Sequence, residues 1–402
     1  MKEKESHLVC LRTEDEIRHE MREIGVSAGG IECMTGKARF YGIKVKDISC
    51  RSANILKQEM LSRGGEAAVS ARTVYAEGNT DVLLLGTVLQ LTYLAEKLEK
   101  QPLGLKKVAE AIRQILDGIG KKDFSFSLPD GKTLTLPENM TRIMGIVNIT
   151  PDSFSDGGRY FSPKDAIRQA EALWEDGADI LDLGAVSSRP QAVFPDEEEE
   201  WRRLCPVIRE LGKQDMVLSV DTFRGTVAER CLEAGAHIVN DIGGFRMDAA
   251  LAGTAARWGC PVVVMHNRMQ VNAKPYEDFL SDVVGDLQES VQLGLKAGVK
   301  PEQLILDPGI GFGKTPAQNR LLIRNLAIFQ GMGYPLLLGL SRKSFLADTL
   351  PALSLPEERD DASLALGIMG ALNGARILRV HEVKKTKQAM QIIDKVRNEK
   401  NG

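Results

Sequence analysis

The stretch RIMGIVNITPDSFSDGGRYFSPKDAIRQAEALWEDGADILDLG, residues 142–184, decides the fold of most of this chain. Its apolar start ends on Asn148, and a polar, glycine-containing loop follows. Ser162 then precedes Pro163, a pair typical of a helix start. The apolar face of that helix consists of Ala166, Ala170, Leu173 and Trp174. A second apolar run at 179–184 completes a unit of strand, loop, helix and strand.

The same unit recurs along the chain after residue 141. The predicted strands cover residues 142–148, 179–184, 216–221, 237–241, 261–266, 304–309, 336–341 and 376–381. Eight strand and helix units within roughly 260 residues are typical of a (β/α)8 barrel, the TIM barrel. A doubly wound open sheet is the alternative, but it rarely uses eight strands that alternate so evenly. We therefore assign residues 141–402 to a catalytic α/β barrel.

The residues before the barrel form a different pattern. Residues 1–122 are predicted to be a small α/β N-terminal domain of unknown role, and residues 123–140 a hairpin and linker with its turn at Pro129, Asp130 and Gly131. The predicted helices lie near 13–24, 51–65, 88–100 and 104–117, with one strand at 81–87. The glycine pairs at 29–30 and 64–65 indicate turns. We find no catalytic constellation in this region.

The composition limits the class of protein. The chain has 402 residues, 43% hydrophobic content and a net charge of −3, so no basic field indicates nucleic acid or an anionic membrane as partner. The first ten residues have no apolar signal segment, and we expect a cytoplasmic protein. The six cysteines include no C-x-x-C pair, which argues against a zinc site.

Polar residues stand at the end of every predicted strand. They are Asn148, Asp182, Asp221, Asn240, Asp241, His266, Asp307, Ser341, Arg342, Lys343, Arg379 and His381, with Met265 beside His266. In a barrel of this class the carboxyl ends of all strands meet at one mouth, where the active site lies. A single Asp or Asn at a strand end often only caps the next helix. Polar groups at all eight ends are better explained by a shared active site.

The glycine-rich segment DPGIGFGKT, residues 307–315, suggests a phosphate loop but fails the known patterns. Pro308 stands where the first glycine of a Walker motif belongs, and the spacing also fails G-x-G-x-x-G. A nucleotide triphosphatase is therefore unsupported. What remains is a flexible loop that carries Phe312 and Lys314 beside Asp307.

The strand-end groups divide into two chemical kinds. Asp221, Asn240 and Asp307 suit the N–H edge of a flat aminopyrimidinone ring, and the same carboxylates could instead be metal ligands. Lys343 could bind a ring carbonyl or nitrogen of the same ligand. On the other side, Arg379 and His381, with Arg189 after the second strand, suit a phosphate group.

Asn148 offers a neutral oxygen where the first strand ends. A Mg²⁺ ion that is bound mainly by substrate phosphate and water needs only one or two such protein ligands. We therefore expect Mg²⁺ as cofactor and Asn148 as its protein ligand.

The motifs of the barrel resemble one enzyme family. The stretch MGIVNITPDSFSDGG resembles the signature of the dihydropteroate synthases, and SVDT, VND, LDPGIGFGKT, SRKS and RVHEV resemble its later motifs in the right order. The resemblance does not cover residues 1–135. It implies condensation of 6-hydroxymethyl-7,8-dihydropterin pyrophosphate with p-aminobenzoate in folate biosynthesis. It also implies a homodimer and a sulfonamide target.

The resemblance implies a role for each motif residue. It assigns pterin binding to Asp221, Asn240, Asp307 and Lys343. It assigns the pyrophosphate and Mg²⁺ to Asn148, Arg189, Arg379 and His381. It assigns p-aminobenzoate to Phe154, Ser188, Pro190, Phe312 and Ser344. Asp182, Met265 and Lys314 complete the expected substrate contacts. We expect the reaction itself to depend on Asn148, Asp221, Lys343, Arg379 and His381.

The second loop departs from the family. LGAVSSRPQA, residues 183–192, has Ala185 and Val186 where the family has glycine and glutamate, although Arg189 and Pro190 persist. Two alternatives therefore stay open. One is a pterin-binding paralogue without synthase activity. The other is a pterin-binding methyltransferase domain that works with a corrinoid, which would have no use for the TPDSFSDGG loop.

Overall fold

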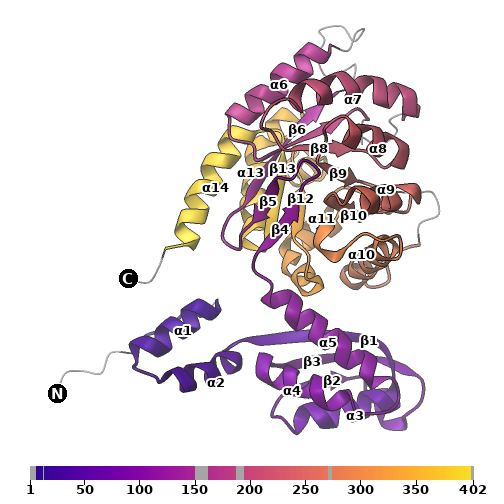
Figure 1. Cartoon of the computed structure of the whole chain (residues 1–402). Helices are drawn as coiled ribbons and strands as arrows, with labels where there is room; N and C mark the ends of the chain where they lie inside the picture. Colours follow the sequence, from indigo (N-terminus) through magenta and orange to yellow (C-terminus); the bar gives the residue numbers. More distant parts are fainter. Residues whose placement is uncertain (1–5, 12, 150–161, 187–193, 270–273, 400–402) are drawn as a thin grey trace, which may run out of the picture. The chain divides into compact units, whose positions relative to one another are not determined.

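The computed structural model describes residues 6–11, 13–149, 162–186, 194–269 and 274–399 (Figure 1). The chain forms two compact units, residues 1–120 with 400–402, and residues 121–399. Within the described residues no helix is long and apolar enough to cross a membrane.

The larger unit is a closed barrel of eight parallel strands. Their order around the barrel is β10, β11, β12, β13, β6, β7, β8, β9. The strands are β6 (Arg142–Asn148), β7 (Ile180–Gly184), β8 (Leu218–Asp221), β9 (Ile238–Asp241), β10 (Val262–Met265), β11 (Leu304–Asp307), β12 (Leu336–Gly339) and β13 (Ala375–Val380). Pairing of β13 with β6 closes the ring through neighbours such as Arg379 and Met144. The predicted barrel is therefore confirmed, and the open sheet is excluded.

Helices surround this barrel (Figure 1). They are α6 (Pro163–Glu175), α7 (Glu197–Leu211), α8 (Gly225–Glu233), α9 (Ala250–Trp258), α10 (Phe279–Lys296), α11 (Pro316–Arg324), α12 (Phe345–Thr349), α13 (Asp360–Leu372) and α14 (Val383–Arg397). On α6 the expected face is buried, since Ala166 and Ala170 are fully enclosed. Ser162 stands at the N-cap before Pro163 as expected, but its hydroxyl makes no capping hydrogen bond to the helix.

A hairpin closes the end of the barrel opposite the strands' carboxyl ends. It consists of β4 (Phe124–Ser127) and β5 (Thr133–Leu136), paired antiparallel. Its apolar side chains are Phe126, Leu128, Leu134 and Leu136, and they pack on Met144, Ile180, Ile238, Val263, Ile305, Leu337 and Ile377 of the strands. We call this layer the barrel floor. His237 lies at its edge, where Nδ1 accepts from the Leu218 N–H at 3.0 Å and Nε2 lies 3.1 Å from Asp130.

The N-terminal unit has a core of its own. Its antiparallel sheet has the order β1 (Phe40–Ser49), β3 (Asn79–Thr87), β2 (Glu66–Val69). Its helices are α1 (Glu14–Glu23), α2 (Ala28–Ala38), α3 (Cys50–Leu61), α4 (Val88–Leu98) and α5 (Leu105–Gly120). Fifteen buried apolar residues, Leu56, Leu84 and Leu94 among them, form one cluster.

Two details of this unit correct the sequence interpretation. Gly30 does not form a turn with Gly29, because both lie in α2, where Ser27 accepts a hydrogen bond from the Gly30 N–H. The strand β1 was not expected at all. Gly64, by contrast, is in a turn with φ of +72°.

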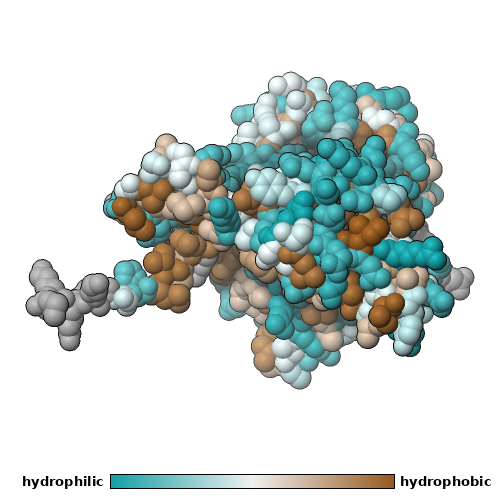
Figure 2. All heavy atoms as spheres, turned by 90° about the horizontal axis from the view of Figure 1, so that it is seen from below, coloured by the Kyte–Doolittle hydropathy of each residue, from teal (hydrophilic) through white to brown (hydrophobic). Residues whose placement is uncertain are grey.

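The surface of the described residues carries separate hydrophobic patches. Figure 2 shows mostly hydrophilic residues on the visible face, with hydrophobic patches between them. Exposed apolar side chains occur in both units, including Val74 and Tyr75 in the first and Ile392 and Val396 on α14 in the second.

Candidate active site

The carboxyl ends of the strands gather the expected polar residues at one mouth. Asn148, Asp221, Met265 and Asp307 are the last residues of their strands, and Asp182 and Asn240 lie within theirs. Neighbouring strands place Gly184 beside Asp221, and Asp221 beside Asn240. Phe154, Ser188, Arg189 and Pro190 lie outside the described residues.

Arg379 joins the two carboxylates of the mouth. Its Nε donates to Asp182 at 2.6 Å, and its Nη2 donates to Asp221 at 2.8 Å. Asn240 also donates to Asp182, at 3.0 Å. The sequence separated Arg379, as a phosphate ligand, from these carboxylates. The structure adds contacts with them, because the guanidinium of β13 reaches across the barrel to β7 and β8.

Burial shapes the ionisation of this group. Burial raises the pKa of Asp221 to about 7, although the charge of Arg379 works in the opposite direction. For Arg379 burial opposes the charged form, but the carboxylates of Asp182 and Asp221 hold its pKa above the usual value. Asp221 and Arg379 thus depend on each other for their charges.

One carboxylate oxygen of this group has no partner within the described residues. Asp182 is fully buried, and its Oδ1 makes no hydrogen bond there, whereas its Oδ2 accepts from both Arg379 and Asn240. A buried carboxylate oxygen without a donor is unfavourable by roughly 1–3 kcal/mol. A ligand that brings an N–H or O–H donor would remove that cost.

Asp307 and Lys343 form the opposite wall of the mouth. Asp307 accepts from the Gly309 N–H at 2.7 Å, and burial raises its pKa while Lys343 acts to lower it. Lys343 donates to the Ile310 carbonyl, and its ammonium lies 4.5 Å from the centre of the Phe312 ring. Burial lowers the pKa of Lys343 to about 8.

The Phe312 ring belongs to a small apolar cluster at this wall. Its buried members are Ile242, Met265 and Phe312, and Phe223 packs against them. The cluster offers an apolar surface beside the polar residues of the strand ends. A flat ring could therefore be contacted on its face here and on its edge by the carboxylates.

The residues after β12 and β13 are held by local contacts. The His381 ring Nδ1 lies 3.0 Å from the Ser341 hydroxyl, which also accepts from the His381 backbone N–H. Arg342 makes a bidentate pair with Asp360, at 2.7 and 2.8 Å, so its charge is already used. Ser344 is exposed at the start of α12.

Lys314 makes its hydrogen bonds within the protein. Its ammonium is directed to the Gly309 carbonyl at 2.7 Å, the Phe312 carbonyl at 3.1 Å and His266 Nδ1 at 2.8 Å. These protein contacts favour a role inside the loop over the substrate contact that the sequence predicted. These bonds link the loop to itself and to the segment after β10.

Sequence reasoning missed the residues that support the mouth from behind. Arg203 donates to the Ala185 carbonyl at 3.1 Å, and Arg224 donates to the Pro195 carbonyl at 2.8 Å. Arg224 is itself paired with Glu200, which is fully buried. The acidic run at 197–200 could have signalled partners of this kind, but it reads equally well as the first turn of α7.

The residues that could hold a metal are few. The described residues contain no group of three or more His, Cys, Asp or Glu suited to a metal ion. Asn148, half-buried at the end of β6, offers an amide oxygen. This donor set fits a hard ion that takes most of its ligands from a substrate and water, and it does not fit zinc.

Comparison with known proteins gives a consistent result. The family described as pterin binding enzyme matches residues 144–381. The dihydropteroate synthase of Bacillus subtilis is 44% identical over 259 residues, which cover 64% of this chain and 89% of that protein. A solved Xanthomonas albilineans dihydropteroate synthase with 4-aminobenzoic acid is 39% identical, with a TM-score of 0.64, covering 69% of this chain and 99% of that one.

A further relative extends beyond the barrel. A probable bifunctional folylpolyglutamate synthase/dihydropteroate synthase of Halobacterium salinarum is 36% identical over 391 residues. The match covers 95% of this chain, so it includes most of the N-terminal unit. It covers only 46% of that longer protein.

Proposed function

This chain belongs to the pterin-binding enzyme family, and we propose that it performs the family's chemistry with the residues at its barrel mouth. It is a transferase that condenses 6-hydroxymethyl-7,8-dihydropterin pyrophosphate with p-aminobenzoate to 7,8-dihydropteroate. The observation that supports our assignment of residues is the group of Asp182, Asp221, Asn240 and Arg379, in which one oxygen of Asp182 has no donor among the described residues.

We assign the pterin to Asp221, Asn240, Asp307 and Lys343. A carboxylate in a buried site accepts two parallel N–H bonds from an aminopyrimidinone, which an amide or hydroxyl cannot match. The Lys343 amino group lies 4.5 Å from the centre of the Phe312 ring and interacts with the charge of Asp307, so it can donate to a ring carbonyl or nitrogen. Met265 belongs to the apolar cluster that would contact the ring face.

We assign the pyrophosphate to Arg379 and His381, with Arg189 as a third ligand. Loss of pyrophosphate leaves a cation at the pterin methylene, so the site must stabilise the leaving group more than it must activate a base. If the Ser341 hydroxyl donates to His381 Nδ1, the proton of that ring lies on Nε2, where it can face an anion. The arylamine is neutral at pH 7 and attacks without a general base.

We propose Mg²⁺ as cofactor, with Asn148 as its protein ligand. The amide oxygen fits a hard cation, and substrate phosphate oxygens and water would complete its shell. The bound ion would neutralise charge on the pyrophosphate as it leaves.

We place p-aminobenzoate against Phe312, with Phe154, Ser188, Pro190 and Ser344 as further contacts. Phe312 offers a ring face next to the pterin residues. We also propose that the enzyme is a cytoplasmic homodimer and a sulfonamide target, since sulfonamides carry an arylamine like that of the substrate. Analytical ultracentrifugation and inhibition against p-aminobenzoate would test the last two proposals.

The decisive experiment supplies the pterin pyrophosphate, p-aminobenzoate and Mg²⁺ to the whole chain. We expect dihydropteroate and pyrophosphate in equal amounts, and no product without Mg²⁺. Pterin binding without product would indicate a paralogue that lacks synthase activity. Methyl transfer from a methylated pterin to a corrinoid would indicate the methyltransferase alternative.

A further inference from the structure

The loop after β11, residues 308–315, directs three backbone carbonyls at two lysines. The Gly309 and Phe312 carbonyls accept from Lys314, and the Ile310 carbonyl between them accepts from Lys343. A phosphate loop presents its N–H groups to an anion. This loop has the opposite polarity, because its carbonyls accept hydrogen bonds from lysine amino groups that the protein itself provides.

Three glycines permit this shape. Gly309, Gly311 and Gly313 have φ values of +68°, +83° and +63°. A Cβ at Gly309 would lie 1.9 Å from the His266 carbonyl oxygen, and one at Gly313 would lie 2.6 Å from the Arg268 backbone. The loop after β11 therefore packs directly on the segment after β10.

A chain of buried groups holds Lys314 in place. His266 Nδ1 lies 2.8 Å from the ammonium, and His266 Nε2 lies 2.9 Å from Asp286 of α10. Burial lowers the pKa of His266 to about 4, so the ring is neutral at pH 7. Its single proton then belongs on Nε2, toward the carboxylate, and Nδ1 accepts from Lys314.

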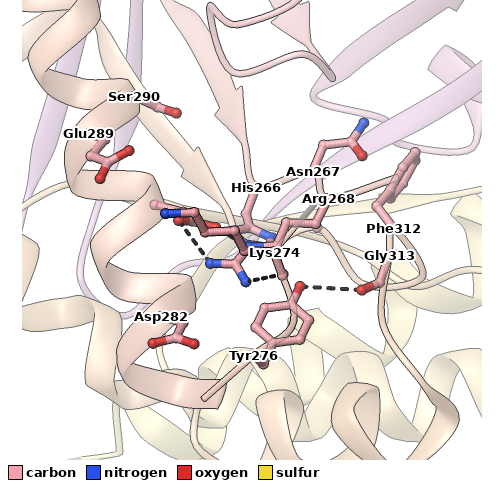
Figure 3. A network of polar contacts seen from close by, with 12 residues as sticks. His266, Asn267, Arg268, Lys274, Tyr276, Asp282, Glu289, Ser290, Phe312 and Gly313 are labelled. Carbon is pink, nitrogen blue, oxygen red and sulfur yellow. Dashed lines mark hydrogen bonds and ion pairs between the residues drawn. The ribbon is translucent and has the colours of Figure 1, made fainter. Parts of the chain in front are cut away.

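The carboxylate behind His266 is fixed as well. Arg268 donates to both oxygens of Asp286, at 2.6 and 3.1 Å. The Arg268 guanidinium also lies 4.3 Å from the centre of the Tyr276 ring. Figure 3 shows Tyr276 reaching to Gly313, and its hydroxyl donates to the Gly313 carbonyl at 3.3 Å. The same cluster thus ties the loop at a second point.

The Lys314 amino group directs its N–H bonds at acceptors within the protein, and burial lowers its pKa to about 7. They serve His266, Gly309 and Phe312, so this lysine has no donor left for a substrate. Two of these bonds fix the carbonyls on either side of Ile310, whose own carbonyl holds Lys343. A shift of the loop would move both the Phe312 ring and the anchor of Lys343.

We propose that Lys314, held by His266 and Asp286, is a positioning residue that sets Phe312 and Lys343 for substrate binding. The inference rests on the proposed function, because Phe312 and Lys343 are the residues assigned there to p-aminobenzoate and pterin. Lys314 touches neither substrate. It acts through the carbonyls of the loop.

The test compares Lys314→Met with His237→Gln. Both variants remove a buried polar group of a hydrogen-bonded chain that ends on a carboxylate. Lys314 lies behind the mouth, and His237 lies at the barrel floor. Calorimetry measures the Kd of a pterin without pyrophosphate. Steady-state kinetics measures the KM for p-aminobenzoate, and thermal unfolding measures the Tm. We expect Lys314→Met to raise Kd and KM by about fivefold or more, with a smaller change in kcat. His237→Gln should lower only the Tm.

A second variant guards against misfolding. His266→Gln keeps an acceptor for Lys314, and we expect a smaller rise of the same Kd and KM, about twofold. Unchanged Kd and KM in every folded variant, with only a lower Tm, would overturn the proposal.

Hydrogen exchange of the amides at 309–313 separates this proposal from the proposed function. We expect at least about tenfold faster exchange in Lys314→Met, whatever the enzyme's activity. The natural chain could make no dihydropteroate while Lys314→Met still changes the exchange rate and the pterin affinity. In that case the proposed function fails and the positioning role stands. Unchanged exchange in Lys314→Met would count against the positioning role itself.

Discussion

The two ends of the barrel are built in opposite ways. At the floor, a hairpin seals the strands with apolar side chains, and His237 has a partner on each ring nitrogen. At the mouth, Asp182 keeps a buried oxygen without a donor within the described residues, and burial displaces the pKa values of Asp221 and Lys343. The floor therefore serves stability, whereas the mouth gives up stability for binding.

The largest effect should come from removing half of the floor. A chain that begins at Pro129 lacks β4, so Phe126 no longer covers the strands. We expect this fragment to aggregate or to unfold without a cooperative transition, as measured by circular dichroism during heating. Replacing a buried phenylalanine by alanine alone commonly costs about 3–5 kcal/mol.

The matched control begins at Lys121. It keeps the hairpin and the bond from Arg376 to the Lys122 carbonyl. Because residues 121–399 form a compact unit, we expect a folded barrel with kcat within about tenfold of the full chain. If the fragment from Pro129 folds and works as well as the one from Lys121, the floor does not have the role described.

The second largest effect should come from the mouth. Arg379→Met leaves the carboxylates of Asp182 and Asp221 buried without their cation. We expect kcat to fall at least about a hundredfold, since a donor to the leaving group is lost. A pterin that lacks phosphate should also bind more weakly, because the two carboxylates repel each other and one of them takes up a proton.

Calorimetry with that pterin distinguishes two views of Arg379. Weaker binding in Arg379→Met would agree with the ion pairs of the structure. Unchanged binding together with slow turnover would indicate that Arg379 binds only the phosphate and does not support the pterin residues.

A third effect concerns acid stability. His266 has a folded pKa of about 4 against the usual 6.5, so between these pH values the unfolded state binds more protons than the fold. The contribution of His266 to the free energy of unfolding should therefore fall as the pH falls from about 6.5 to 4, by roughly 3 kcal/mol. Urea titrations at several pH values would measure this slope.

The variant His266→Gln isolates that contribution. The difference in free energy of unfolding between the natural chain and this variant should shift by the His266 contribution as the pH falls from about 6.5 to 4. The variant His237→Gln measures the contribution of the barrel floor to the same pH dependence, because burial lowers the pKa of His237 as well. Parallel slopes for His266→Gln and the natural chain would contradict the neutral state of His266.

The smallest effect should come from the second loop. Ala185 is fully buried with its carbonyl bound by Arg203, and Val186 is half-buried. Restoring the family residues by Ala185→Gly with Val186→Glu should lower the KM for p-aminobenzoate by about threefold and leave the pterin KM nearly unchanged. Steady-state kinetics measures both constants. A change in the pterin KM alone would link this loop to the pyrophosphate.

The sequence predicted the barrel because its strands carry a strong, repeated signal. Each apolar run ends in a polar residue, and parallel strands bring those residues to one mouth whatever their spacing. The N-terminal unit was less predictable. In β1 the lysines Lys44 and Lys46 and the exposed Phe40 obscure the strand, and in α2 a serine cap outweighs two glycines at the helix start.

The contacts of the candidate site were predictable only in part. That Asp221 and Arg379 share one mouth follows from topology, but which pairs bond depends on side-chain length and on the width of the barrel. Lys314 and His266 are 48 residues apart, and Asp286 looks like any acidic residue of an amphipathic helix. No local pattern distinguishes such partners from surface charges.

The glycines of the loop after β11 also limit how this enzyme can evolve. Each is a position where any side chain strains the backbone, and at Gly309 and Gly313 it would also collide with the neighbouring segment. Few substitutions at these glycines are therefore tolerated, even under selection for a different amine substrate or for resistance to an inhibitor that resembles it. We expect adaptive substitutions to collect instead at side chains that can change size without moving the chain, such as Phe312 and Val186.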